Sequence, residues 1–385
     1  MAWKSRRCGG GIAAGTLACV AARAGAQPYE LSEATDLLNA ELANLGGHVA
    51  VIVRQDGRDV YRFQAGDIGY GTKTRLASFT KTLSAGVVLS VRDSGQLALD
   101  ERVGDTITLM STRGIGDATV TDCFGMRHGI STPIAYEIDS RFTLSEAVNR
   151  IALTGTQSFT PGAALEYDGV GMEVVGRICE LKTGLDWDTL SRQRIFDPCG
   201  MGEADYEQFA PNPAIAGGAR SSAEETIRFA QMVIDGGWNA GWNNGTRVLS
   251  QASVDQLFTN STQGWPVLGS PWPASSPHYP YGEQPDYGFG TWIYEQRPDD
   301  GMVEQIIGAG AWGSFMWIDQ RRGMIAVLIT DVPAGSQASF DAALGVFAIA
   351  AAESDAHQVG LVVATPGADT ILTRNPVAGA TGYRV

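Results

Sequence analysis

The sequence predicts a mixed α/β (α+β) fold, in which an antiparallel sheet of about five strands is flanked by helices and interrupted by an inserted helical subdomain. Three observations support this prediction. Runs of β type lie toward both ends of the chain, helical periodicity fills its middle, and Asp56-Gly57 joins the first two β runs as a tight turn. The chain has 385 residues, of which 44% are hydrophobic, so it can bury a core of this size.

The first part of the predicted domain contains a helix and a hairpin. Leu31 to Leu45 is amphipathic, and His48 to Val53 and Val60 to Phe63 are short β runs. A glycine-rich loop from Gly66 to Arg75 follows. It leads into a segment in which apolar residues recur at helical spacing: Leu83, Val87, Val88 and Val91. We therefore expect a buried helix directly after this loop.

The middle of the chain predicts a helical subdomain over about residues 105–285. Helices are expected near 144–153, 170–183, 186–196, 222–235 and 250–258. From Thr262 to Tyr287 the composition changes to tryptophan, tyrosine and proline, including Trp265 and Trp272. Long irregular segments inside compact domains are typically lids or binding loops, and we expect these two tryptophans to contact a substrate. The alternative is a surface excursion without a role in binding.

The last part of the domain returns to the sheet. Three β runs are expected, Tyr287 to Tyr294, Gly313 to Ile318 and Met324 to Thr330, with a tight turn between the last two. A helix from Ser336 to Ala352 then closes a domain that we place at residues 27–356. Because the strands lie at both ends and the helices between them, the catalytic crevice is expected where the two parts meet.

The two ends of the chain predict separate segments. Residues 1–26 have the basic start, apolar stretch and small-residue cleavage site of a signal peptide, which predicts a periplasmic or secreted protein. Residues 357–385 are predicted to be a linker followed by the start of a further unit. Ile371 to Val377 and Gly379 to Val385 resemble the opening strands of a fibronectin type III domain. Two strands are not stable alone, so this end is either a mobile tail or part of a longer protein.

Composition restricts the partners. The formal net charge of -14 argues against binding to nucleic acid or to anionic membranes, and no apolar run is long enough for a membrane span. No residues have metal-ligand spacing, so we expect neither metal nor cofactor, and the expected partner is a small-molecule ester or amide. Three cysteines remain beyond the leader. Cys179 and Cys199 either form a disulfide or are two buried thiols.

Ser78 and Lys81 are the strongest candidates for chemistry. The chain has only four lysines, and Lys81 alone follows a serine at this offset. Residues three apart on a helix face the same way, which brings the amine within reach of the hydroxyl. A serine hydroxyl becomes a good nucleophile when a neighbouring base takes its proton, and a neutral lysine can be that base. The alternative is a helix-capping serine beside a solvated lysine.

Further motifs occur in the order typical of one family. These are S-F-T-K at 78–81, D-S-G-Q-L-A-L-D at 93–100, Y-D-G at 167–169, F-D-P-C-G-M at 196–201, G-G-A-R-S-S-A-E-E-T at 217–226 and G-S-F-M-W-I-D at 313–319. Over about residues 30 to 352 the chain resembles the serine β-lactamase and penicillin-binding-protein superfamily, on its class C side. This side includes D,D-peptidases and family VIII carboxylesterases. The resemblance implies the β-lactamase/transpeptidase-like fold.

The resemblance also implies roles. Ser78 would be the acylated nucleophile, Lys81 its base and Tyr167 the residue that shares the proton with Lys81. The backbone N–H groups of Ser78 and of Ala311 would form the oxyanion hole, with Ala311 on an edge strand. The alternatives are that Tyr167 is a half-buried core tyrosine and that Ala311 is an ordinary strand residue.

Two departures from the family pattern bear on the substrate. Gly169 stands where the family has an asparagine, and Gly308, at the start of Gly308-Ala309-Gly310, stands where it has lysine or histidine. Both departures remove polar groups that β-lactams need, while Trp312 indicates an apolar or aromatic partner. We therefore expect an exported carboxylesterase for uncharged esters. The alternatives are an amide or peptide hydrolase, such as a D-aminopeptidase, D,D-peptidase or weak β-lactamase, and a non-catalytic binding protein.

Overall fold

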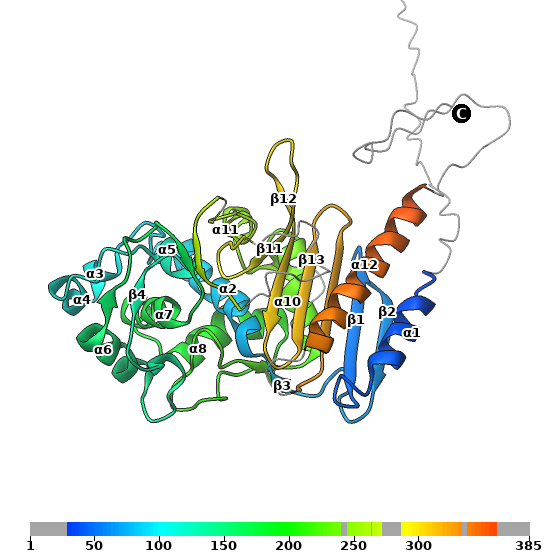
Figure 1. Ribbon diagram of the computed structural model, residues 1–385, viewed down its shortest axis with the longest axis horizontal. Coiled ribbons are helices and arrows are strands. Elements are labelled where there is room, and N and C mark those ends of the chain that lie inside the picture. Colours follow the sequence, from blue (N-terminus) through cyan, green and yellow to red (C-terminus); the bar gives the residue numbers. More distant parts are fainter. Residues whose placement is uncertain (1–28, 240–244, 263, 272–285, 333–336, 360–385) are drawn as a thin grey trace, which may run out of the picture.

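The computed structural model describes residues 29–239, 245–262, 264–271, 286–332 and 337–359. The expected signal peptide, Trp272 and the fibronectin-like segment therefore lie outside the described residues. Figure 1 shows two parts side by side, a sheet covered by helices and a mainly helical region, with helix α2 (Thr80–Asp93) between them. This arrangement agrees with the fold class expected from the sequence.

One antiparallel sheet joins the two ends of the domain. Its strand order is β11-β12-β13-β14-β1-β2. The strands are β1 (Val49–Gln55), β2 (Arg58–Ala65), β11 (Trp292–Gln296), β12 (Val303–Gly310), β13 (Ser314–Asp319) and β14 (Met324–Ile329). The hairpin β1–β2 pairs with the C-terminal strands through β14, with Ala50 opposite Ile329. The predicted Asp56-Gly57 turn is confirmed between β1 and β2.

The sheet has six strands rather than the expected five or so. The missed strand is β12, whose sequence V-E-Q-I-I-G-A-G ends in residues with low β propensity. It forms because β11 and β13 supply ladder partners on its two sides. The predicted β run at Tyr287 to Tyr294 is also shifted, since β11 begins only at Trp292.

Helices cover both faces of the sheet (Figure 1). Helix α10 (Ala223–Ile234) contacts β13, β14 and β1, while α12 (Gln337–Val359) contacts β13 and packs along α1 (Ser32–Glu41). On the α12 side, Trp317 stacks on Phe347 with ring centroids 5.2 Å apart. Every residue of β13 and β14 is buried because neither face meets water.

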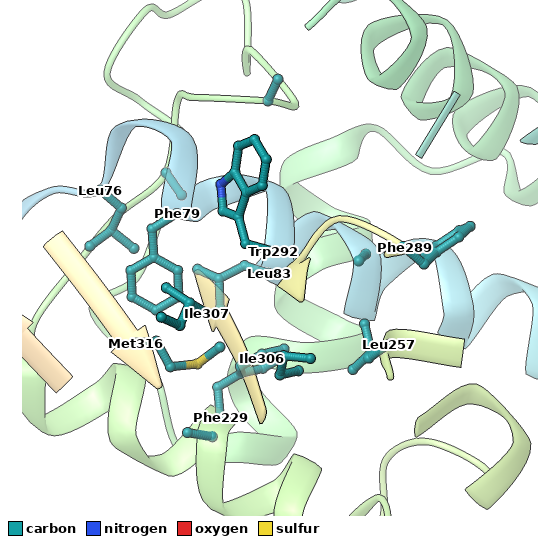
Figure 2. Packing of buried hydrophobic residues seen from close by; sticks show 14 of the residues in the cluster. Leu76, Phe79, Leu83, Phe229, Leu257, Phe289, Trp292, Ile306, Ile307 and Met316 are labelled. Atoms are coloured by element: carbon teal, nitrogen blue, oxygen red, sulfur yellow. The ribbon is translucent and has the colours of Figure 1, made fainter. Parts of the chain in front are cut away.

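The helical region surrounds α2 on the side away from the sheet. Its helices are α3 (Val103–Thr106), α4 (Thr108–Thr112), α5 (Val120–Phe124), α6 (Leu144–Thr154), α7 (Val170–Thr183), α8 (Trp187–Ser191), α9 (Asp197–Cys199) and α11 (Gln251–Leu257). Helix α2 contacts α7 and α11 as well as β12, and every residue from Thr80 to Val91 is buried. Figure 2 shows Phe79 and Leu83 packed with Ile306, Ile307 and Met316 of the sheet. Helix α2, which carries Lys81, is therefore held from both parts of the domain.

The cysteines of the described chain do not form a disulfide. Cys123, Cys179 and Cys199 are buried free thiols, so the disulfide considered for Cys179 and Cys199 is absent and the alternative of two buried thiols holds. Burial raises the pKa of Cys199 to about 12. A search of the described helices finds none that is both long and apolar enough to cross a membrane.

Candidate active site

Ser78 lies on a strained turn just before α2. It is the central residue of the 3₁₀ helix Ala77–Phe79, and Ala77 adopts a left-handed φ of 45°. Such a conformation costs a residue with a Cβ about 1–2 kcal/mol. Contacts of Leu76 hold the turn, because its N–H donates to the Ala219 carbonyl at 3.0 Å and its carbonyl accepts from Ser314 Oγ at 2.6 Å. Ser78 is thereby presented half-buried in a fixed position.

The structure brings Lys81 and Ser78 together. Lys81 Nζ donates to Ser78 Oγ at 3.1 Å and to the Ala216 carbonyl at 3.0 Å. The lysine is only 5% exposed, although a charged lysine is rarely buried without a partner. The contribution of Ala216 was not predicted, because it depends on a loop far from Lys81 in sequence. These two bonds fix the amine beside the hydroxyl that it is expected to activate.

Tyr167 reaches the same place from the other part of the domain. It lies between β6 (Leu165–Glu166) and α7, with its ring centroid 4.6 Å from Lys81 Nζ. The ring stacks on Trp292 at 5.0 Å and meets Tyr287 edge-on at 5.7 Å. Among the described residues its hydroxyl has no hydrogen-bond partner, so Tyr167 contacts Lys81 through the face of its ring.

Asp168 and His128 fix the backbone that follows Tyr167. Asp168 Oδ1 accepts from the Val170 N–H at 2.8 Å and lies 3.0 Å from His128 Nε2. Because His128 Nδ1 accepts from the Ile130 N–H at 2.9 Å, the proton of the neutral ring is on Nε2 and is donated to Asp168. Sequence reasoning missed this pair. The available signal for Asp168 was an aspartate two residues before a helix, from which its side chain can accept from the backbone at the helix start.

The end of β12 approaches the nucleophile turn closely. Strand β11 pairs with β12 only as far as Ile307, so residues 308–310 extend beyond it. A Cβ at Gly310 would lie 2.0 Å from the Leu76 carbonyl oxygen, and only glycine permits this contact. Ala311 follows in the turn to β13, and its N–H has no acceptor among the described residues. The expectation that Ala311 lies on an edge strand is wrong, since it is one residue past the second strand of the sheet.

Trp312 and Trp265, two tryptophans predicted to bind substrate, lie in different surroundings. The guanidinium of Arg75, which pairs with Asp331, covers the Trp312 ring at 3.6 Å from its centroid. Trp265 instead lies beside Arg127 and lines a cavity of about 740 Å³. None of Ser78, Lys81 and Tyr167 lines that cavity. Trp265 therefore faces a cavity separate from the serine and its base.

The two glycines that depart from the family pattern lie where neighbouring side chains fill the space. A Cβ at Gly308 would lie 2.9 Å from both Phe79 Cδ2 and Thr82 Oγ1. A Cβ at Gly169 would lie 2.9 Å from Glu137 Cγ and 3.0 Å from Ala216 Cβ. Real Cβ atoms are essentially never found closer than 3.0 Å to such neighbours, so both positions are closed to larger residues as the chain is packed.

Glu173 supports the loop that carries Ala216. It is fully buried on α7, and its Oε2 accepts from the Ile215 N–H at 2.9 Å. Burial raises the pKa of the Glu173 carboxyl well above its usual value, which favours the neutral form. No signal in the sequence identified it. Within the described ranges, no group of three or more His, Cys, Asp or Glu side chains could hold a metal ion.

A buried lysine bonded to a serine, at the start of a helix between an antiparallel sheet and a helical region, defines a serine hydrolase of the S-x-x-K type. The Beta-lactamase family model matches residues 41–350, which is most of the chain. The chain belongs to the Beta-lactamase family.

Individual relatives agree with this assignment. The chain is 26% identical to Penicillin-binding protein 4 of Amycolatopsis lactamdurans over 348 residues, covering 77% of this chain and 89% of the relative. A solved structure of a candidate beta-lactamase from Bacteroides dorei is 21% identical, with a TM-score of 0.75, and covers 85% of this chain and 99% of its own. EstCE1, a hydrolase with promiscuous acyltransferase activity, is 13% identical, with a TM-score of 0.67 and coverages of 83% and 97%. The two structures show that the fold is shared.

Replacing Gly310 tests the contact between β12 and the nucleophile turn. Gly310→Ala places a Cβ 2.0 Å from the Leu76 carbonyl, so the strand and the turn must separate. A displacement of about 1 Å in a catalytic group can cost about 10²-fold in rate, and we expect a loss of this size in covalent labelling of Ser78 by a fluorophosphonate. Gly71→Ala is the control, because no atom lies within 4 Å of a Cβ there. Equal labelling of both variants would contradict this view.

Replacing Glu173 tests its neutral state. A carboxyl whose pKa is raised in the folded protein stabilises it fully below the unfolded pKa, and that stability falls as pH rises toward the folded pKa. Glu173→Gln removes this dependence while it keeps an acceptor for Ile215. The variant should therefore unfold at a higher temperature than the wild type at pH 8, and the difference should shrink toward pH 4. A thermal midpoint lower than that of the wild type at pH 8 would mean that Glu173 is charged when folded.

Proposed function

We propose that the protein is a carboxylesterase that acts on uncharged small or aromatic esters through an acyl-enzyme at Ser78. The observation that supports this most directly is the 3.1 Å hydrogen bond between Lys81 Nζ and Ser78 Oγ in a crevice that lacks a basic residue at position 308. The predicted leader at 1–26 adds the proposal that the enzyme works outside the cytoplasm.

Acylation uses the pair of Lys81 and Ser78. The Lys81 amine takes the hydroxyl proton as Ser78 Oγ attacks the ester carbonyl carbon, which forms a tetrahedral intermediate with a negatively charged oxygen. The N–H groups of Ser78 and Ala311 donate to this oxygen. An oxyanion donor of this kind contributes about 3–4 kcal/mol to transition-state stabilisation, because it is aimed at charge that develops only during the reaction.

Departure of the alcohol completes the first half of the reaction. The proton held by Lys81 passes to the leaving alkoxide. The family resemblance assigns Tyr167 to share this proton, and here its ring face lies over the Lys81 amine. The carbon–oxygen bond breaks and leaves the acyl group on Ser78. Water then attacks the acyl carbon and gives one proton to the Lys81 amine. Lys81 returns this proton to Ser78 Oγ as the acyl–oxygen bond breaks and the acid product leaves.

The choice of substrate follows from which polar groups are missing. A β-lactam carries a carboxylate that needs a cationic partner. Gly308 has no side chain, and the space beside it is filled by Phe79 and Thr82, which carry no positive charge. Each missing hydrogen bond to a charged group costs about 1.5–3 kcal/mol. An uncharged ester needs only the serine, its base and the two N–H donors.

Ser78→Ala tests the nucleophile. We expect hydrolysis of p-nitrophenyl butyrate to fall by about 10³-fold or more, since the other groups cannot form the acyl-enzyme. Fluorophosphonate labelling should disappear, which also separates an enzyme from a non-catalytic binding protein. The exposed Ser131→Ala is the matched control and should keep both activities. Retained turnover in a purified, folded Ser78→Ala protein would refute the assignment of the nucleophile.

A comparison of two substrates tests the selectivity. The kcat/KM for p-nitrophenyl butyrate should exceed that for nitrocefin by at least about tenfold, because the β-lactam carboxylate loses at least one charged hydrogen bond at Gly308. Both rates are measured on the same wild-type preparation by absorbance. Ser78→Ala provides the blank for spontaneous hydrolysis. Nitrocefin turnover equal to or faster than ester turnover would show that our interpretation of Gly169 and Gly308 is wrong.

A further inference from the structure

Glu137 occupies the place of the missing asparagine. It lies on the 3₁₀ helix Tyr136–Ile138, far from the Y-D-G motif in sequence. Its side chain nevertheless fills the space beside Gly169, where a Cβ would lie 2.9 Å from Glu137 Cγ and 3.6 Å from its Cβ. The absence of a side chain at position 169 thus makes room for an acid from another segment.

The carboxyl of Glu137 is incompletely satisfied. Its Oε2 is buried and has no hydrogen-bond partner among the described residues. A buried acceptor without a donor costs about 1–3 kcal/mol, and more if it is charged, so such groups are rare unless they have a function. The Glu137 carboxyl therefore has one buried oxygen available to a hydrogen-bond donor.

The Lys81 amine, by contrast, has a hydrogen-bond donor to spare when it is charged. Its amine uses two hydrogen bonds, to Ser78 Oγ and to the Ala216 carbonyl. An ammonium has three hydrogens, and within the described chain the third has no acceptor. Ala216 links the two groups, because its carbonyl binds Lys81 and its Cβ borders the space beside Gly169 that Glu137 fills. The Lys81 charge also acts on the Glu137 carboxyl.

We propose that Glu137 is a positioning residue for Lys81: its carboxylate, which makes no direct hydrogen bond to the amine within the described chain but lies beside Gly169 and Ala216, stabilises by its charge the ammonium formed during acylation. The inference rests on the proposed reaction at Ser78. In that step the Ser78 O–H bond breaks, a Lys81 N–H bond forms, and the positive charge appears at Nζ. The Glu137 carboxylate keeps its negative charge throughout, so it favours the charged product of the transfer without itself exchanging a proton.

The ionisation of Glu137 makes this role depend on pH. Burial raises the pKa of the Glu137 carboxyl above 4.5, and the nearby Asp168 acts in the same direction, while Lys81 and His128 oppose them. Glu173, whose own pKa is raised partly by Glu137, faces it from α7. Below the pKa of Glu137 its carboxyl is neutral and stabilises an ammonium less. Activity should therefore decline on the acid side through a pKa higher than that of an exposed glutamate.

The test compares Glu137→Gln and Glu137→Asp with Asp139→Asn, a control that changes an acid paired with Arg141 next to the same short helix. For p-nitrophenyl butyrate, Glu137→Gln should lower kcat by about 10- to 100-fold with KM changed by less than about threefold. The acid limb due to Glu137 should be lost from its pH profile. Glu137→Asp keeps a carboxylate and should keep that limb, and Asp139→Asn should match the wild type. Far-ultraviolet circular dichroism verifies that each variant is folded.

The rate of fluorophosphonate labelling tests the role of Glu137 independently of whether the natural substrate is an ester. Labelling depends on activation of Ser78 and not on the ester, so Glu137→Gln should slow it by a similar factor even if the natural substrate is an amide. A Glu137→Gln protein that labels and turns over like the wild type, with the same acid limb, would overturn the inference and leave the esterase proposal intact. A wild type that is not labelled would overturn both.

Discussion

The site depends on a backbone contact between the sheet and the nucleophile turn. Gly310, at the end of β12, lies against the Leu76 carbonyl so closely that no Cβ fits. The same carbonyl accepts from Ser314 at the start of β13, so both strands hold the residue two positions before Ser78. Because position 310 has no side chain, the two backbones can meet, and this contact joins the end of β12 to the turn that carries Ser78.

The second part of the domain supplies the groups around Lys81. Tyr167, held by Asp168 and by the aromatic rings of Tyr287 and Trp292, reaches it from the start of α7. The loop that carries Ala216 provides a carbonyl acceptor, and the buried Glu173 carboxyl holds that loop by accepting from the Ile215 N–H. A buried amine thus has neighbours from both halves of the fold, and its chemistry depends on how the halves pack.

The sequence alone predicts the parts of this site that are local. Ser78, on the 3₁₀ turn Ala77–Phe79, and Lys81, in the first turn of the α2 helix that follows it, are three residues apart, so their contact follows from local helical geometry. The fold class follows from the order of β and helical runs, although β12 was missed because its glycine-rich end is extended only by its partners in the sheet. Ala216, Glu137 and the pair of Asp168 and His128 come together only through tertiary packing. No short sequence pattern predicts such long-range contacts.

The buried thiols described above have a consequence for how the protein can be handled. A domain that is cross-linked by disulfides changes its stability with the redox potential of its surroundings. In the described chain Cys123, Cys179 and Cys199 carry no such bond, and burial raises the pKa of each thiol and so suppresses the reactive thiolate. The packing of the catalytic domain is thereby insensitive to reducing agents, and its thiols resist alkylation while it stays folded. Reagents directed at cysteine can serve as reporters of unfolding in this domain.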